Sequence, residues 1–212
     1  MTLNKFQALN LIQLLNLSIK NPKTTLKYKN RFTLLTSVVL SAQCTDVNVN
    51  NVTKTIYKKF FTPQHFINLG IKKITNLIKS IGLFNMKAKN LYKLSKILVK
   101  KHQSKVPNNF DDLINLPGVG RKTANVVLNE AFNKPTIAVD THVFRVANRT
   151  GLTNGINPNQ VEDQLLKILP KKYLKKAHHL ILLHGRYTCK SRNPLCSKCM
   201  IKNICLYKGK ND

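Results

Sequence analysis

The feature that most restricts the fold of this chain is its hydrophobic pattern, which repeats at helical spacing along nearly all of its 212 residues. Near the N-terminus, four apolar residues fall on one helix face with polar residues between them: Leu9, Ile12, Leu15 and Ile19. The alternation of apolar and polar residues that indicates a half-buried strand is almost absent. We therefore predict an all-α protein in which short connections join antiparallel neighbours.

The helices that we predict are separated by Pro, Gly or Asn residues, which favour turns. After the N-terminal helix, they cover residues 32–42, 47–60, a segment starting near 64, 71–79, 87–100, 111–115, 122–132, 143–149, 161–169 and 172–185. The apolar run at 32–42 predicts a buried helix, whereas the segment 47–60 is expected to be more exposed.

The chain carries 36 Lys and Arg residues against 8 Asp and Glu, a formal net charge of +28. Such a field attracts polyanions, so nucleic acid and anionic membrane surfaces are the partners to consider, and small acidic substrates are poor candidates. No segment approaches the roughly 20 continuous apolar residues of a membrane span, and the N-terminus lacks the pattern of a signal peptide. The odd number of cysteines argues against a disulfide framework. Together these features predict a cytoplasmic protein with no membrane partner.

The segment Leu-Pro-Gly-Val-Gly-Arg-Lys at 116–122 joins two predicted helices through a turn that contains two glycines. Pro117 fixes its own φ, while Gly118 and Gly120 can take positive φ and let another backbone approach. The first amides of the following helix then point outward at the positive end of its dipole, which binds a phosphate without reading a base. An ordinary helix–helix turn is the alternative, but the adjacent Arg121 and Lys122 favour an anion site.

Four cysteines near the C-terminus have the spacing C-x6-C-x2-C-x5-C: Cys189, Cys196, Cys199 and Cys205. Four thiolates in one short segment can hold zinc or an iron–sulfur cluster, and the spacing alone leaves both open. Zinc ribbons usually pair two C-x2-C knuckles, and this loop has a single C-x2-C pair. Four basic residues lie between the cysteines, where a folded loop would present them to phosphates: Lys190, Arg192, Lys198 and Lys202.

Three stretches of the chain resemble the endonuclease III family of DNA glycosylases. They are LPGVGRKTANVVL at 116–128, which has the form of a helix-hairpin-helix motif, TIAVDTH at 136–142, and LSAQCTD at 40–46. The resemblance extends from the first helix to the last cysteine, and it departs from the family at Cys44, where an alanine is expected. It implies two helical domains with a DNA-binding cleft and a [4Fe–4S] cluster held by the four cysteines of the loop 189–205.

The resemblance also implies roles for individual residues in removing an oxidised pyrimidine and nicking the strand. Lys122 attacks C1′ of the damaged nucleoside and forms a Schiff base, after which β-elimination breaks the strand 3′ to the lesion. Asp140 activates the nucleophile and stabilises positive charge on the sugar, and it is also placed to cap the next helix. Leu83 is the apolar wedge that fills the vacated base stack, Gln43 enters from the other side, and His142 contacts the DNA or lines the pocket.

The domain organisation expected from the family is discontinuous. The domain with the hairpin covers residues 23–133, and residues 1–22 join 134–212 in a second, iron–sulfur domain. Lys122 and Asp140 are then expected to face each other across the cleft. The expected partner is double-stranded DNA that contains damaged pyrimidines or abasic sites, bound by a monomer.

Three alternative functions compete with this interpretation. A related adenine glycosylase shares the fold and the cysteine spacing, but it lacks a lysine at position 122 and carries a further C-terminal domain. A non-catalytic DNA-binding protein would use the hairpin and the lysines alone, and a redox module would depend on the potential of its cluster. Replacement of Lys122 discriminates among them, because only the lyase would lose strand cleavage while keeping DNA binding.

Overall fold

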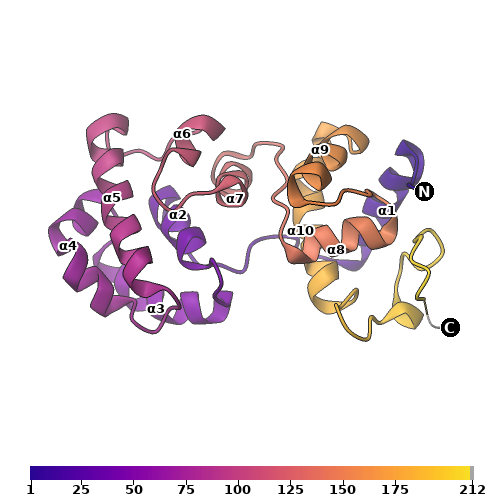
Figure 1. Ribbon diagram of the computed structural model, residues 1–212, viewed down its shortest axis with the longest axis horizontal. Coiled ribbons are helices and arrows are strands. Elements are labelled where there is room, and N and C mark those ends of the chain that lie inside the picture. Colours follow the sequence, from indigo (N-terminus) through magenta and orange to yellow (C-terminus); the bar gives the residue numbers. More distant parts are fainter. Residues whose placement is uncertain (211–212) are drawn as a thin grey trace. The chain divides into compact units, whose positions relative to one another are not determined.

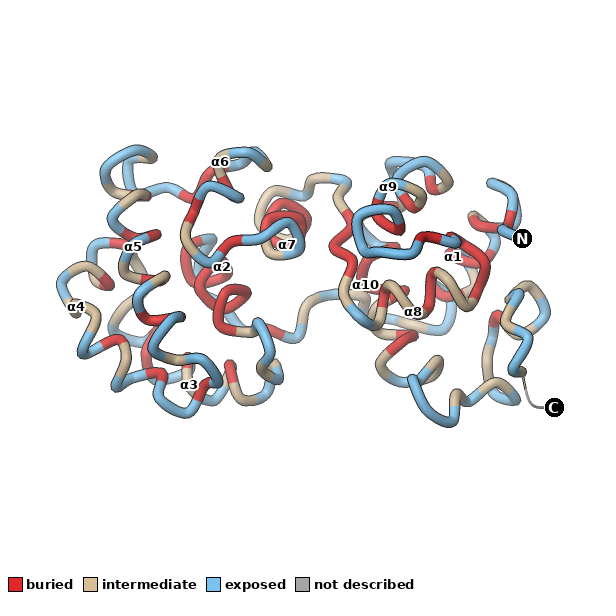
Figure 2. The backbone as a smooth tube through the Cα atoms, in the orientation of Figure 1, coloured by how far each residue is buried: buried red, intermediate tan, exposed pale blue. Residues whose placement is uncertain are grey.

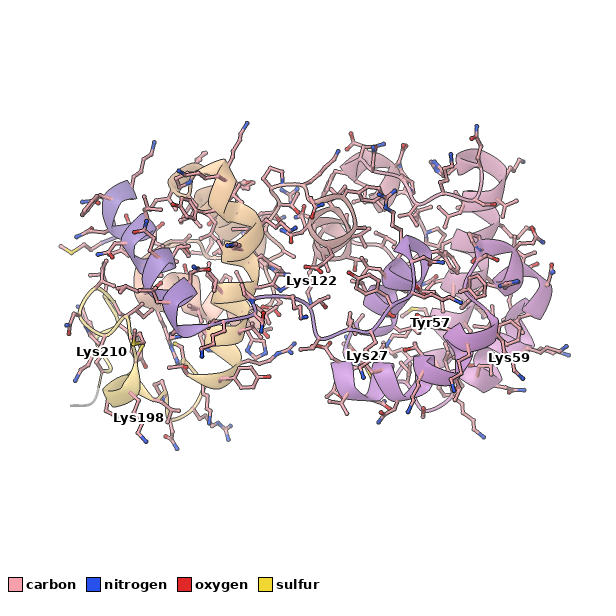
Figure 3. The ribbon with its side chains drawn as sticks, turned by 180° about the vertical axis from the view of Figure 1, so that it is seen from behind. Lys27, Tyr57, Lys59, Lys122, Lys198 and Lys210 are labelled. Atoms are coloured by element: carbon pink, nitrogen blue, oxygen red, sulfur yellow. The ribbon has the colours of Figure 1, made fainter. Side chains whose placement is uncertain are left out.

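The computed structural model describes residues 1–210, which form ten α-helices and one short 3₁₀ helix and contain no β-strand (Figure 1). The all-α fold expected from the hydrophobic pattern is confirmed. No helix within these residues is both long and apolar enough to cross a membrane. Lys59 and Lys198 are among the lysines whose side chains extend away from the ribbon (Figure 3).

The chain divides into two compact units, which we call the hairpin unit and the cysteine unit. The hairpin unit is Thr25–Phe132, and the cysteine unit is Met1–Thr24 together with the residues from Asn133 onward. The expected domain bounds of 23–133 and of 1–22 with 134–212 stay a prediction, because compactness alone does not show that a segment folds by itself.

Six helices make up the hairpin unit: α2 Arg31–Leu40, α3 Asp46–Lys59, α4 Pro63–Leu77, α5 Phe84–His102, α6 Phe110–Ile114 and α7 Arg121–Phe132. Helix α4 packs against α5, and α2 packs against α7. Every residue of α2 from 32 to 40 is buried, so the prediction of a buried helix in this region is confirmed (Figure 2). The two helices expected around residues 64–79 are both present. They meet at a kink at Gly70, where φ is +68° and the backbone is not helical, and together they make up α4.

The described part of the cysteine unit contains four α-helices and a 3₁₀ helix: α1 Lys5–Ser18, α8 Thr141–Thr150, α9 Pro158–Ile168, α10 Lys171–Tyr187 and η1 Cys196–Lys198. Helix α10 packs against α8 and α1. The core between them is aliphatic and includes Leu11 and Leu15 from α1 and Leu180 from α10. Cys189 and Cys199 pack against this core, so the cysteine loop is attached to the helices at two of its four thiols.

A buried polar cluster joins α2 to α3 in the hairpin unit. The Tyr57 hydroxyl lies 2.7 Å from Oγ1 of Thr36 and 2.8 Å from Oγ of Ser37. Burial raises the pKa of Tyr57 to about 12, although its two hydroxyl neighbours partly oppose that shift. The hydroxyl therefore stays protonated in the folded protein at pH values where a tyrosine in an unfolded chain ionises.

This cluster predicts an alkaline loss of stability that belongs to Tyr57. Between pH 10 and 12 the unfolded chain has released the Tyr57 proton and the folded chain has not, so the free energy of unfolding falls as pH rises. The contribution is on the order of 3 kcal/mol, at roughly 1.4 kcal/mol per pH unit. Urea unfolding at pH 8 and pH 11 should therefore show a smaller alkaline loss for Tyr57→Phe than for the natural chain. Tyr187→Phe, at an exposed position, is the matched control, and equal losses in all three proteins would contradict the assignment.

Candidate functional site

The turn between α6 and α7 is a tight hairpin built on one glycine. The Val119 N–H donates to the Leu116 carbonyl at 3.0 Å, which closes the turn. Gly118 has φ +80°, and a Cβ added there would stand 2.9 Å from the side-chain nitrogen of Asn90 on α5. Both the backbone conformation and the neighbouring side chain therefore require glycine at 118. Gly120 does not have a positive φ and has open space around it, so only the first glycine meets the conformational expectation.

The two cations that follow the turn are the first residues of α7. Arg121 and Lys122 are both exposed, and the Arg121 guanidinium lies over the Phe110 ring, 5.3 Å from its centroid. The first N–H groups of a helix have no acceptor within the helix and carry the positive end of its dipole. The structure thus gathers Gly118, Gly120, Arg121 and Lys122 in one short segment that suits an anionic ligand.

Gln43 and Leu83 lie on two turns of the hairpin unit that are held beside each other. Both have left-handed backbone conformations, with φ of 54° and 59°. Both side chains are exposed, Leu83 by 51%, which is unusual for a leucine at the start of a helix. The turns touch at Gly82, where an added Cβ would stand 3.8 Å from the Gln43 carbonyl oxygen. The apolar side chain of Leu83 is therefore available to a partner and not used in the core.

Asp140 is the N-cap of α8. Its Oδ1 accepts a hydrogen bond from the Val143 N–H at 2.8 Å, and the half-buried carboxylate is thereby fixed at the start of the helix. His142 follows on the same helix, with its Nδ1 3.3 Å from Nη2 of Arg145. Arg145 in turn donates to the carbonyls of Gly185, at 2.8 Å, and Cys189, at 3.1 Å. Helix α8 thus carries two predicted site residues and is bonded to the first cysteine of the loop.

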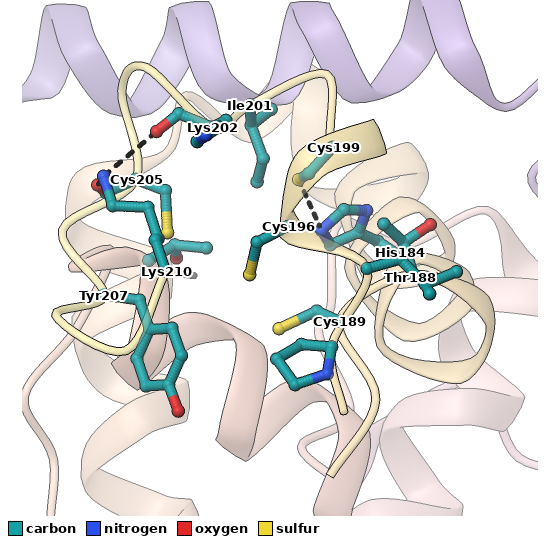
Figure 4. A pocket seen from close by; sticks show the side chains of 13 residues that line it. His184, Thr188, Cys189, Cys196, Cys199, Ile201, Lys202, Cys205, Tyr207 and Lys210 are labelled. Atoms are coloured by element: carbon teal, nitrogen blue, oxygen red, sulfur yellow. Dashed lines mark hydrogen bonds between the residues drawn. The ribbon is translucent and has the colours of Figure 1, made fainter. Parts of the chain in front are cut away.

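The four predicted cysteine ligands line one pocket, and their sulfur atoms surround its interior (Figure 4). All four are free thiols that are neither fully buried nor fully exposed. Burial raises the pKa of Cys199 and Cys205, and the charges of the neighbouring thiolates raise both further. Within residues 1–210, no three His, Cys, Asp or Glu side chains meet the spacing of a site for a single metal ion.

Two side chains that the sequence did not single out contact the cysteine loop. His184 of α10 has its Nε2 3.7 Å from the Cys199 sulfur, and burial lowers its pKa to about 4, so the ring is neutral at pH 7. Arg149 of α8 donates to the carbonyls of Lys190, at 2.7 Å, and Ser191, at 3.0 Å. No spacing rule finds these contacts, because they join residues that are 15 positions apart for His184 and 41 or 42 positions apart for Arg149. The exposed loop cations Lys190, Arg192 and Lys198 belong to the same segment.

A family model described as HhH-GPD superfamily base excision DNA repair protein matches residues 36–171. The chain belongs to the HhH-GPD superfamily. It is 58% identical over 187 residues to endonuclease III of Rickettsia conorii, which covers 88% of this chain and 89% of the relative. It is 48% identical over 210 residues to endonuclease III of Escherichia coli K12, covering 99% of this chain and 100% of the relative.

The fold is also similar to those of solved protein structures. A trapped endonuclease III–DNA covalent intermediate, an estranged-adenine complex, superposes with a TM-score of 0.91 at 42% identity, covering 96% of both chains. A thermostable thymine-DNA glycosylase has the same fold, with a TM-score of 0.86 at 22% identity. The expected family, the all-α fold and the enzyme class, a DNA glycosylase with AP lyase activity, are confirmed. As a base excision repair protein of the HhH-GPD superfamily, the chain acts on DNA.

Proposed function

We propose that this HhH-GPD chain excises oxidised pyrimidines from double-stranded DNA and cleaves the strand 3′ to the resulting abasic site by β-elimination. The observation that carries the proposal is Lys122, an exposed primary amine in the first turn of α7, directly after a hairpin suited to a phosphate. A helix N-terminus that binds the backbone of DNA holds the neighbouring amine close to the sugar. Amines are the protein groups that form Schiff bases with carbonyl carbons.

The proposed reaction uses Lys122 as the nucleophile at C1′ of the damaged nucleoside. Its nitrogen forms a bond to C1′ as the glycosidic bond breaks, and the damaged base leaves with the electron pair and takes up a proton. Opening of the sugar ring breaks the C1′–O4′ bond and gives the Schiff base. Loss of a C2′ proton then expels the 3′ phosphate, which cuts the strand, and water releases Lys122.

Asp140 supplies the negative charge for the same step. As the base leaves, positive charge develops on the sugar, and a fixed carboxylate stabilises it without having to reorganise. The cap hydrogen bond from the Val143 N–H uses one carboxylate oxygen, so the side chain is held in place while its second oxygen is available. We assign Asp140 to this electrostatic role and to activation of Lys122.

We assign recognition of the lesion to two groups of side chains, one that enters the base stack and one that binds the phosphates. A glycosylase must turn the damaged nucleotide out of the stack, and the gap needs a filler. We propose that Leu83 is the wedge and that Gln43 enters opposite the lesion, since both are exposed on adjoining turns. We assign phosphate binding to the hairpin residues Gly118, Gly120 and Arg121 and to the loop cations Lys190, Arg192 and Lys198, with His142 as a further DNA contact.

The cysteine pocket fits the iron–sulfur cluster that the family resemblance implies. Soft thiolates are the ligands that iron–sulfur clusters use, and four of them face one pocket (Figure 4). We propose that Cys189, Cys196, Cys199 and Cys205 hold a [4Fe–4S] cluster, which supplies a crosslink for the loop. The expected domain bounds, the monomeric state and the cytoplasmic location belong to the same proposal.

Borohydride trapping tests the proposed chemistry directly. The protein is incubated with a duplex that contains thymine glycol, and borohydride is added to reduce the Schiff base to a stable amine. We expect a covalent protein–DNA adduct, and mass spectrometry of its peptides should place the DNA on Lys122. Base removal without an adduct would indicate a monofunctional glycosylase, and an adduct on another lysine would move the nucleophile to that residue.

A further inference from the structure

One lysine of the hairpin unit is placed unlike all the others. Lys87, on the first turn of α5, is 3% exposed, and it is the one buried lysine among residues 1–210. Its ammonium donates to the carbonyls of Leu40, at 2.9 Å, and Ala42, at 2.6 Å. Burial lowers the pKa of Lys87, and the nearby Cys44 opposes that shift. A buried cation is costly unless it is hydrogen-bonded, so these two bonds account for its tolerance in the fold.

The two carbonyls that Lys87 binds precede Gln43. Leu40 is the last residue of α2, where carbonyls have no intrahelical partner and where a cation is favourable. Ala42 is the residue immediately before Gln43, and the left-handed backbone of Gln43 is unfavourable for residues other than glycine. The ammonium thus fixes the backbone on which the exposed Gln43 side chain is carried.

The backbone of Lys87 holds the other turn. Its N–H donates to the Leu83 carbonyl at 3.0 Å, and this bond closes the first turn of α5, which begins directly after the left-handed Leu83. A second contact runs beside it, because the Asn48 side chain donates to the Ser80 carbonyl at 3.1 Å and to the Cys44 sulfur at 3.3 Å. The turns that carry Gln43 and Leu83 are therefore bonded to each other from two sides, and Lys87 touches both.

We infer that Lys87 is a positioning residue that fixes Gln43 and Leu83 relative to each other, so that both enter the base stack in one event. This inference rests on the proposed function of those two side chains. The Lys87 ammonium donates to both carbonyls at once, whereas a methionine at this position would fill nearly the same space and donate nothing. Loss of the ammonium leaves the Leu40 and Ala42 carbonyls to find other partners and frees the Gln43 turn to relax.

The test measures strand cleavage at an abasic site in two DNAs that differ in the free energy needed to unstack the neighbouring bases. One is a fully paired duplex with an abasic site, and the other has the same site inside a bubble of mismatched pairs. We expect Lys87→Met to cleave the paired substrate about 10- to 100-fold more slowly than the natural chain, the scale of a misplaced positioning group. On the bubble, where unstacking is nearly free, the loss should stay within about threefold.

Controls separate this role from simple stability. The ratio of the two rates is taken on one preparation, so a reduced folded fraction cancels. Lys93→Met removes an exposed charge from the same helix and should have the rate ratio of the natural chain. Lys87→Arg restores a donor cation, so it should recover part of the rate on the paired duplex that Lys87→Met loses. Leu83→Ala should show the same substrate preference as Lys87→Met.

Two outcomes would overturn the inference. If Leu83→Ala is selective for the bubble but Lys87→Met slows both substrates equally or neither, Lys87 has no positioning role. If Leu83→Ala itself shows no preference, the wedge assignment in the proposed function fails, and the inference about Lys87 fails with it. The Leu83→Ala arm therefore shows which of the two is wrong.

Discussion

Replacing Lys122 with glutamine is expected to lower strand cleavage by at least about a thousandfold, because loss of a covalent nucleophile removes the reaction path and not only a contact. Glutamine has nearly the helix propensity of lysine, and position 122 is exposed, so the helix and the fold should remain intact. Binding to a lesion duplex should weaken only by the loss of one cation. Cleavage is measured at single turnover on gels, and binding is measured by titration at several salt concentrations.

Arg121→Gln is the matched control, because it removes an adjacent cation from the same helix turn and keeps the amine. Its borohydride adduct should survive, while the slope of log affinity against log salt should fall by about one phosphate contact. Lys122→Gln should show the same salt effect without the adduct. A Lys122→Gln protein that still cleaves at more than about a tenth of the natural rate would exclude the proposed nucleophile, since such a change is within the effect of a lost binding charge.

The parts of this protein that could be predicted from sequence are those whose cause is local. The apolar run at 32–42 indicates a buried helix because it contains no charged side chain, and α2 is buried from residue 32 to residue 40. Pro117 and Gly118 specify a hairpin because their backbone preferences are properties of single residues. Asp140 could be expected as a helix cap for the same reason, and the structure shows the cap hydrogen bond.

The parts that could not be predicted depend on which carbonyls the fold leaves without partners. Lys87 is one of 36 basic residues, and the residues that flank it in the sequence do not distinguish it from the exposed Lys89. Its burial follows from the end of α2 lying beside the start of α5, which is a tertiary fact. Arg149 likewise finds its acceptors in a loop some forty residues further along the chain. The left-handed backbone of Leu83 is also set by neighbouring turns, because leucine itself disfavours it.

Replacing Cys196 with serine is expected to lower bound iron from about four atoms per chain to well below that number, because four thiolates are required to hold a [4Fe–4S] cluster. The segment around it has few apolar side chains to bury, and its regular structure is limited to the 3₁₀ helix Cys196–Lys198. Metal binding in such a segment is coupled to its folding. The loop should therefore loosen, while the aliphatic core of α1, α8 and α10 keeps the helices of the cysteine unit. Iron content is measured by metal analysis, and helix content by circular dichroism.

The same variant should also lose DNA affinity in a salt-dependent way. A loosened loop no longer presents Lys190, Arg192 and Lys198 together, so the slope of log affinity against log salt should fall by up to about three phosphate contacts. Cys44→Ser, which alters a cysteine of the hairpin unit, should keep the full iron content and the full slope.

A variant with glutamine at all three loop cations separates the metal from the charges. It should retain iron and show the reduced slope, because the cysteines that hold the loop are unchanged. Full iron in Cys196→Ser would contradict the assignment of Cys196 as a ligand. Iron loss in Cys196→Ser with an unchanged slope of log affinity against log salt would instead show that the loop cations do not touch the phosphates. The Cys196→Ser variant and the glutamine variant share only the loss of ordered positive charge at 190–198, so a fall in slope common to both is assigned to those charges.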